Sequence, residues 1–260
     1  MGAPGGTYDL LPFVGAVRSI PLAVSADARL ICRCDDSADY VIKDDHSGDC
    51  NATTPPSEWF CTKLAEHVGI ASPVCKIVRM PGGEAAFGSR WEGGILAGGN
   101  WWDRVKDRTI PYDDVIGPLS RIYAFDLFVH NADRHLQNFL VRESHGGGHV
   151  LLAMDYSRSW LRWGFPLPPP PMAPSESTRT ARRYLSTDWG LPSVKEDEAE
   201  AVLERLRRTP EGLIQRILDE QPDNWLSVTA RRDILGWWAS TARTDRLNAI
   251  STGISDGSYL

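Results

Sequence analysis

The sequence has no pair of cysteines at the CxxC spacing that zinc ribbons and redox motifs use. Its five cysteines form an odd set, and two of them, Cys32 and Cys34, are only alternate residues of a predicted strand. The other three are Cys50, Cys61 and Cys75. Neither a zinc ribbon nor a disulfide framework is therefore indicated. A chain of 260 residues is long enough to bury a sizeable core without such cross-links.

Long apolar runs are missing as well. No run is long enough to cross a bilayer, and the first residues lack the basic start and apolar stretch of a secretory signal. The formal net charge of −6 argues against a broad nucleic-acid-binding surface. We therefore expect a cytoplasmic protein that has no membrane span and binds no nucleic acid directly.

Alternating apolar and polar residues predict a β-rich N-terminal part. Strands are predicted at residues 29–34, 39–43, 73–80 and 84–91. Between the second and third strands, residues 58–70 carry apolar side chains at helical spacing, with Ser57 as the expected N-cap and Gly69 as the expected end. We expect a small antiparallel sheet with one helix.

The character of the chain changes near Gly93, where glycines and tryptophans precede a mostly helical pattern. Helices are predicted at residues 119–129, 196–208, 211–220 and 229–242, and short strands at residues 139–141 and 150–154. The sequence therefore predicts an α+β, bilobal fold, with an N-terminal lobe of residues 1–92 and a mostly helical C-terminal lobe of residues 93–260.

A polar cluster follows the predicted helix at residues 119–129 and contains Asp133, His135 and Asn138. Asp155 comes after the two short strands. Phosphoryl transfer needs one carboxylate to orient the acceptor hydroxyl and accept its proton, and a second one to hold Mg²⁺ against the phosphates. Asp133 suits the first task and Asp155 the second.

The spacing within this cluster favours a kinase. Asn138 lies five positions after Asp133 (138 − 133 = 5), the interval between Asp and Asn in the protein-kinase catalytic loop, where the Asn oxygen ligates the metal. Taken singly, these residues read as turn caps or a strand end, whereas their order together indicates phosphotransfer. His135 belongs to the same catalytic set, and we expect it to hold the loop by hydrogen bonding rather than to act as a base.

Lys43 closes the second predicted strand, and Glu58 opens the helix that follows. A lysine on a strand can reach the α and β phosphates of ATP, and a glutamate on a helix can hold its ammonium group in place. A surface lysine and a glutamate at a helix start would look the same in isolation. Only the position of Lys43 and Glu58 before the polar cluster therefore favours an ATP-binding role for the pair.

The segments FDLFVHNADRHLQNFLV and LLAMDYS resemble the catalytic and metal-binding segments of the HipA-like kinases, which share a DRHxxN-type arrangement with phosphatidylinositol 3- and 4-kinases. The segment SEWFCTKLAEHVGIASP is similar to the HipA-like helix that carries a glutamate. The resemblance covers roughly residues 39–160. It implies a protein-kinase-like fold, Ser/Thr protein kinase activity, and ATP and Mg²⁺ as cofactors.

The resemblance also implies a role for each matching residue. These roles are catalytic for Asp133, metal-binding for Asn138 and Asp155, ATP-binding for Lys43 and Glu58, and adenine hinge for Arg90 and Trp91. A protein substrate follows from the same resemblance, which leaves room for an antitoxin-type regulatory partner.

Two features depart from the family pattern. Residues 18–29, where a loop covering the phosphates is expected, contain no GxGxxG motif. Asp155 is followed by Tyr156 and Ser157 rather than by Phe-Gly. The sequence therefore does not predict which residues would cover the phosphates of ATP.

Three alternatives to a protein kinase stay open. The same catalytic loop serves kinases that act on a lipid headgroup or a small molecule. A nucleotide-binding regulatory module without turnover, a pseudokinase, would fit the glycine-poor loop. A metal-dependent phosphohydrolase is the third, with His130, Asp133 and His135 facing one ion.

Overall fold

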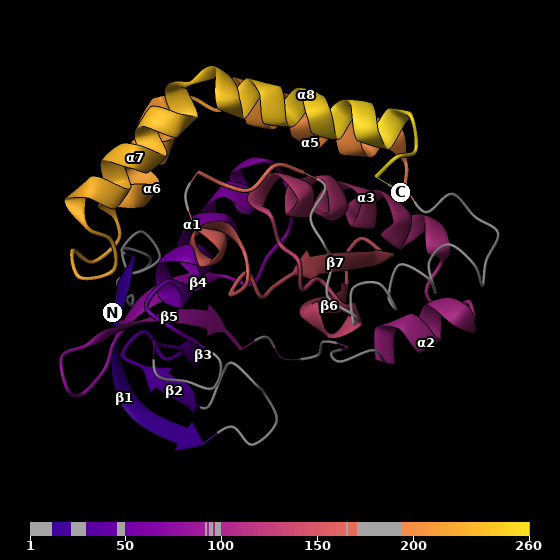
Figure 1. Ribbon diagram of the computed structural model, residues 1–260. Coiled ribbons are helices and arrows are strands. Elements are labelled where there is room, and N and C mark those ends of the chain that lie inside the picture. The colour runs from indigo at the N-terminus through magenta and orange to yellow at the C-terminus, as the bar shows by residue number, and fades with distance from the viewer. Residues whose placement is uncertain are drawn as a thin grey trace, which may run out of the picture.

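The computed structural model describes residues 12–21, 30–45, 50–91, 93, 96, 100–164, 166–170 and 194–259. The chain has an α+β fold, in which a small β-barrel near the N-terminus lies beside a larger, mostly helical part (Figure 1). None of the helices within these ranges is both long and apolar enough to span a membrane.

Five strands close the barrel in the order β1-β2-β3-β5-β4. They are β1 (Phe13–Pro21), β2 (Leu30–Cys34), β3 (Asp39–Lys43), β4 (Cys75–Arg79) and β5 (Ala85–Arg90). The expected simple antiparallel sheet is wrong, because β1 pairs antiparallel with β2 and also parallel with β4. A nine-residue strand with an irregularity between Ala16 and Arg18 can reach both neighbours and so remove the free edges of the sheet.

The two faces of the barrel strands pack in different places, since side chains alternate along a strand. The barrel interior holds Val14, Cys32, Cys34, Tyr40, Ile42, Val78 and Ala86. On the other face, Ile77 and Phe87 pack into the main core with helix α1. None of the cysteines in the described residues forms a disulfide, and both Cys32 and Cys34 are buried on β2, where they occupy alternate positions.

Helix α1 spans Thr54–His67 and begins four residues before the predicted start at residue 58. Two prolines occupy its first turn, where proline is well tolerated because the first helical N–H groups have no partner within the helix. Ser57 is therefore inside the helix, and its predicted capping role is wrong; Thr53 is the N-cap residue. Gly69 follows the helix with a φ of 83°, as expected for a terminating glycine.

The helical part contains α2 (Asn100–Lys106), α3 (Tyr112–Val129), α5 (Glu196–Arg208), α6 (Glu211–Asp219), α7 (Val228–Ala239) and α8 (Thr241–Ser255). A hairpin of β6 (Phe139–Glu143) and β7 (His149–Ala153) follows α3. The helix predicted at residues 229–242 is wrong in extent, because Ser240 adopts an extended conformation and separates α7 from α8. Helices α5 and α8 lie side by side over α3 (Figure 1).

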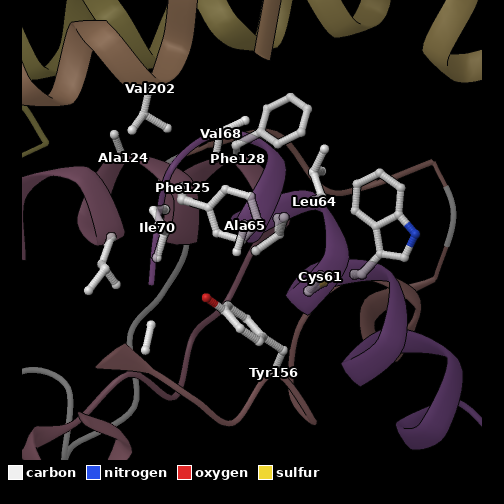
Figure 2. Close-up of a cluster of buried hydrophobic side chains, with 14 of the residues drawn as sticks. Cys61, Leu64, Ala65, Val68, Ile70, Ala124, Phe125, Phe128, Tyr156 and Val202 are labelled. Atoms are coloured by element: carbon white, nitrogen blue, oxygen red, sulfur yellow. The ribbon is translucent and has the colours of Figure 1, made fainter. Parts of the chain in front are cut away.

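The main core joins one face of the barrel strands to the helices. Figure 2 shows part of it, where Leu64 of α1 and Val68, which follows this helix, lie near Phe125 and Phe128 of α3, with Val202 of α5 nearby. Residues of α6, α7 and α8 belong to the same cluster. Because α1 packs against both the barrel and the helices, the side chains that it carries have a defined place relative to each.

Candidate active site

A lysine of the barrel meets two carboxylates that come from distant parts of the chain. Lys43 is the last residue of β3, and its Nζ lies 2.6 Å from Glu58 Oε1 on α1. The same Nζ lies 2.8 Å from Oδ1 of Asp155, which follows β7. Lys43 and Glu58 are buried, whereas the side chain of Asp155 is 24% exposed. The structure thus brings together the predicted ATP lysine, its glutamate and one predicted metal ligand.

The electrostatics of these three groups favour a charged lysine and a charged Asp155. Burial lowers the pKa of Lys43, but Asp155 and Glu58 outweigh this effect and raise it above its ordinary value. Burial alone would raise the pKa of Asp155, yet Lys43 and hydrogen bonds from Ser157 bring it well below its usual range. Burial raises the pKa of Glu58, and Lys43 opposes that rise. Asp155 is therefore ionised at neutral pH, as a metal ligand must be.

The neighbours of Asp155 fix its carboxylate. Its φ of 65° lies in the left-handed region, which is costly for residues other than glycine. Ser157 donates hydrogen bonds to Asp155 Oδ1 from its backbone N–H at 3.3 Å and from its Oγ at 2.7 Å. Tyr156 is fully buried, and Figure 2 shows its ring pointing into the core between α1 and α3. The backbone N–H of Tyr156 also donates to Glu58.

A buried ion pair holds the loop that carries Asp133. Arg134 donates to both carboxylate oxygens of Asp126 on α3, from Nε at 2.9 Å and from Nη2 at 3.1 Å. Its Nη1 donates to the backbone oxygens of Asn138, at 3.0 Å, and of Met154. A bidentate contact between arginine and a carboxylate has a defined geometry. It ties α3, the loop and the segment before Asp155 into one unit.

Asn138 can offer an oxygen to a metal ion. Its Nδ2 donates a hydrogen bond of 2.8 Å to the backbone oxygen of Asp133, so the amide oxygen is the atom left for coordination. Its own backbone oxygen accepts from Met154 N at 3.1 Å, one residue before Asp155. The two predicted metal ligands therefore stand on adjacent chain segments. An amide oxygen and a carboxylate suit the preference of Mg²⁺ for hard oxygen ligands.

Asp133 is accessible to solvent, since its side chain is 26% exposed. Its backbone N–H donates to Asn131 Oδ1 at 3.3 Å, which shapes the turn after α3. Its Oδ2 lies 3.2 Å from Arg158 Nε. A carboxylate in this position can meet an acceptor hydroxyl that approaches from outside.

His135 caps a short turn of the loop, and His130 ends helix α3. His135 Nδ1 accepts a hydrogen bond from the backbone N–H of Gln137 at 3.3 Å and so caps the 3₁₀ turn of residues 136–138. His130 is buried and ends α3 with a φ of 57°. Within the described ranges, no three His, Cys, Asp or Glu side chains are grouped so that they could hold a metal ion. The set of His130, Asp133 and His135 therefore does not form the site that a phosphohydrolase would need.

Arg90 is the last residue of β5, and Trp91 follows it. The backbone N–H of Arg90 donates to Val74 O at 2.8 Å, and that of Trp91 donates to Asp39 O at 2.7 Å. Both amides thus take part in the hydrogen bonding of the barrel. The Trp91 side chain is 52% exposed, so an adenine base would meet its indole or the carbonyl groups rather than these N–H groups.

Sequence reasoning assigned no role to Asp126, Arg134 or Arg158. Asp126 and Arg134 stand inside the motif that carried the resemblance, but their pairing depends on the loop folding back onto α3. Arg158 lies three positions after Asp155, and only this closeness to a predicted metal ligand would have pointed to it. Residues 22–29, most of the segment expected to cover the phosphates, lie outside the described residues.

Comparison with known proteins identifies a family. The family model of HipA-like kinases matches residues 25–156, about half of the chain, and this range includes the polar loop, Lys43, Glu58 and Asp155. No curated protein sequence matches the chain.

One of the solved structures similar to this chain, a kinase, has a similar overall fold. The proinflammatory kinase CtkA of Helicobacter pylori aligns over 88% of this chain and 94% of its own, with a TM-score of 0.57 and 10% identity. HipA of Shewanella oneidensis MR-1, solved with HipB and operator DNA, aligns over 89% of this chain and 64% of its own, with a TM-score of 0.45 and 11% identity. WaaP in complex with acyl carrier protein has a TM-score of 0.39 and 13% identity, over 86% of this chain and 89% of its own. At these identities the likeness to CtkA concerns the fold alone.

Proposed function

Because this chain belongs to the HipA-like kinase family, we propose that it transfers the γ-phosphate of ATP to a serine or threonine hydroxyl of a protein. The contact of Lys43 with both Glu58 and Asp155, at 2.6 and 2.8 Å, is the observation that carries this proposal. It pairs a phosphate-binding cation with a metal-binding carboxylate, which is the arrangement that phosphoryl transfer requires.

Asp133 would act on the acceptor. Its carboxylate accepts a hydrogen bond from the acceptor hydroxyl and takes the proton as the oxygen attacks the γ-phosphorus. One O–P bond forms, the bond between the γ-phosphorus and the β–γ bridging oxygen breaks, and ADP leaves with the electron pair of that bond. The proton on Asp133 then passes to solvent, which the partial exposure of this side chain permits.

Asn138 and Asp155 would hold Mg²⁺ through the amide oxygen and a carboxylate oxygen. When bound, the ion neutralises charge on the phosphates and keeps them in line with the acceptor. The contacts of Ser157 and Lys43 with Asp155 Oδ1 leave the other carboxylate oxygen for the ion.

ATP would lie between an N-terminal lobe of residues 1–92 and a C-terminal lobe of residues 93–260. Lys43 would contact the α and β phosphates, held in place by Glu58. Arg90 and Trp91 would border the adenine, with the exposed indole as a stacking surface. Regulation by an antitoxin-type partner is a further expectation from the family.

Two variants test the assignment of roles. Asp133→Asn should bind Mg-ATP as the wild type does but lose transfer, because the base is removed while the metal ligands stay. Asp155→Asn should weaken Mg-ATP binding as well. Calorimetric titration with a non-hydrolysable ATP analogue and Mg²⁺ measures binding, and labelled ATP with a Ser/Thr peptide library measures transfer. Wild-type rates in the Asp133 variant would rule out this residue as the base.

The acceptor class needs a separate measurement. Labelled ATP offered with the peptide library, with phosphoinositide vesicles and with water alone distinguishes a protein kinase, a lipid kinase and an ATPase. Binding of Mg-ATP without transfer to any of these acceptors would favour the regulatory pseudokinase.

A further inference from the structure

Arg158 contacts the carboxylate that we assign as the base. Its Nε lies 3.2 Å from Asp133 Oδ2, and the two side chains are 37% and 26% exposed. The contact joins the segment that follows Asp155 to the loop that carries Asp133. An ion pair with this much solvent access contributes little to stability. A contribution to stability therefore does not account for the contact between Arg158 and Asp133.

The backbone of Arg158 is held on both sides. Ser159 donates to Tyr156 O through its backbone N–H at 3.1 Å and through its Oγ at 2.6 Å. Trp163 Nε1 donates to the backbone oxygen of Arg158 at 2.6 Å. Ser159 and Tyr156 are fully buried. The arginine thus projects from an anchored turn, so its reach toward Asp133 is set by the fold.

The other cations near the site have different partners. Lys43 contacts both Glu58 and Asp155, and Arg134 donates two hydrogen bonds to the carboxylate of Asp126. Both are buried. Arg158 is the partly exposed cation that contacts Asp133 itself.

We propose that Arg158 is a positioning residue for Asp133: it binds Oδ2 and turns Oδ1 toward the acceptor hydroxyl. This inference rests on the proposed function. With Asp133 as the base, the positive charge of Arg158 would also lie near the acceptor hydroxyl that Asp133 binds. A fixed positive charge there would stabilise the negative charge that develops on the reacting oxygens in the transition state.

The test uses three variants of the full chain. Arg158→Ala removes the guanidinium, Arg158→Lys keeps a charge without the planar donor group, and Arg162→Ala is a matched control from the same segment. Transfer from labelled ATP to the Ser/Thr peptide library is measured with and without added guanidinium chloride at millimolar, non-denaturing concentrations. Thermal melting of each variant reports on folding.

We expect Arg158→Ala to lower kcat by roughly 10- to 100-fold, which is at or below the lower limit of the roughly 100- to 10,000-fold that a general base supplies, because Asp133 itself stays in place. The KM for ATP should stay within about twofold, since Lys43 and the metal ligands are intact. Added guanidinium should restore part of the rate in Arg158→Ala alone, and Arg158→Lys should be intermediate. Arg162→Ala should resemble the wild type.

Three outcomes would overturn the inference: an unchanged kcat in Arg158→Ala, an equal loss in Arg162→Ala, or a loss that guanidinium does not relieve. If the wild type binds Mg-ATP but transfers phosphate to no acceptor, the proposed function fails, and the role of Arg158 fails with it. Transfer by the wild type together with an unaffected Arg158→Ala would reject the role of Arg158 only.

Discussion

Arg246 Nε donates a hydrogen bond of 2.8 Å to the backbone oxygen of Phe128. The same guanidinium donates to Leu127 O at 2.7 Å and to Pro168 O. A side chain of α8 therefore satisfies carbonyl groups in the last turn of α3, which have no partner within that helix. The loop with Asp133 starts directly after these residues. The C-terminal helix thus supports the start of the candidate catalytic loop.

Arg246→Met should lower the free energy of unfolding by about 3 kcal/mol, because it leaves buried carbonyls of α3 without donors. Methionine keeps most of the apolar stem, so packing changes little. Denaturant unfolding measures the effect. Arg208→Met on α5, where the side chain is 77% exposed, is the control and should change the free energy by less than about 0.5 kcal/mol. Equal changes in the free energy of unfolding in the two variants would show that the contact of Arg246 with α3 adds no stability beyond that of an exposed arginine.

Lys43→Met should destabilise the protein more than Glu58→Gln. Removing the lysine leaves two carboxylates facing each other in a largely buried place, at a cost of about 3–5 kcal/mol. Replacing Glu58 leaves the ion pair of Lys43 with Asp155 and removes a charge that burial disfavours, so we expect a loss under about 1 kcal/mol. Urea unfolding at neutral pH compares the two variants, and the reverse order would contradict the proposed charge balance.

His130 should make stability depend on pH. Burial, with a smaller effect of Arg246, lowers the pKa of this histidine to about 4 in the folded chain, against about 6.5 when unfolded. The unfolded state therefore takes up the proton first, and the stability that His130 contributes is complete above about pH 6.5 and is lost as the pH falls toward 4.

The variant His130→Asn isolates this effect. Asparagine tolerates the left-handed backbone found at this position, where φ is 57°, and does not titrate. The free energy of unfolding, measured between pH 4 and pH 7, should depend less steeply on pH in the variant. A slope equal to that of the wild type would assign the acid sensitivity to other groups.

Local patterns predicted most of the elements. Helix α5 has the predicted bounds, because its apolar residues recur at helical spacing with acidic residues at the start and basic ones at the end. The strands β2 to β7 fall where alternation and turn residues place them. Helix α8 was missed, since the pattern gave no sign that Ser240 would separate it from α7. The closed barrel was missed because the pairing of β1 with β4 joins segments some sixty residues apart (77 − 13 = 64).

The sequence by itself determined the chemistry: which carboxylates, amide and lysine are present, in what order, and on which kinds of element. These features are local, because residue type and short-range spacing set backbone preference and side-chain reactivity. Only the tertiary structure decided that Lys43 meets Glu58 and Asp155, that Arg134 pairs with Asp126, and that Arg158 reaches Asp133. Contacts between distant segments follow from how helices and strands pack around a shared core, and no spacing along the chain encodes that packing directly.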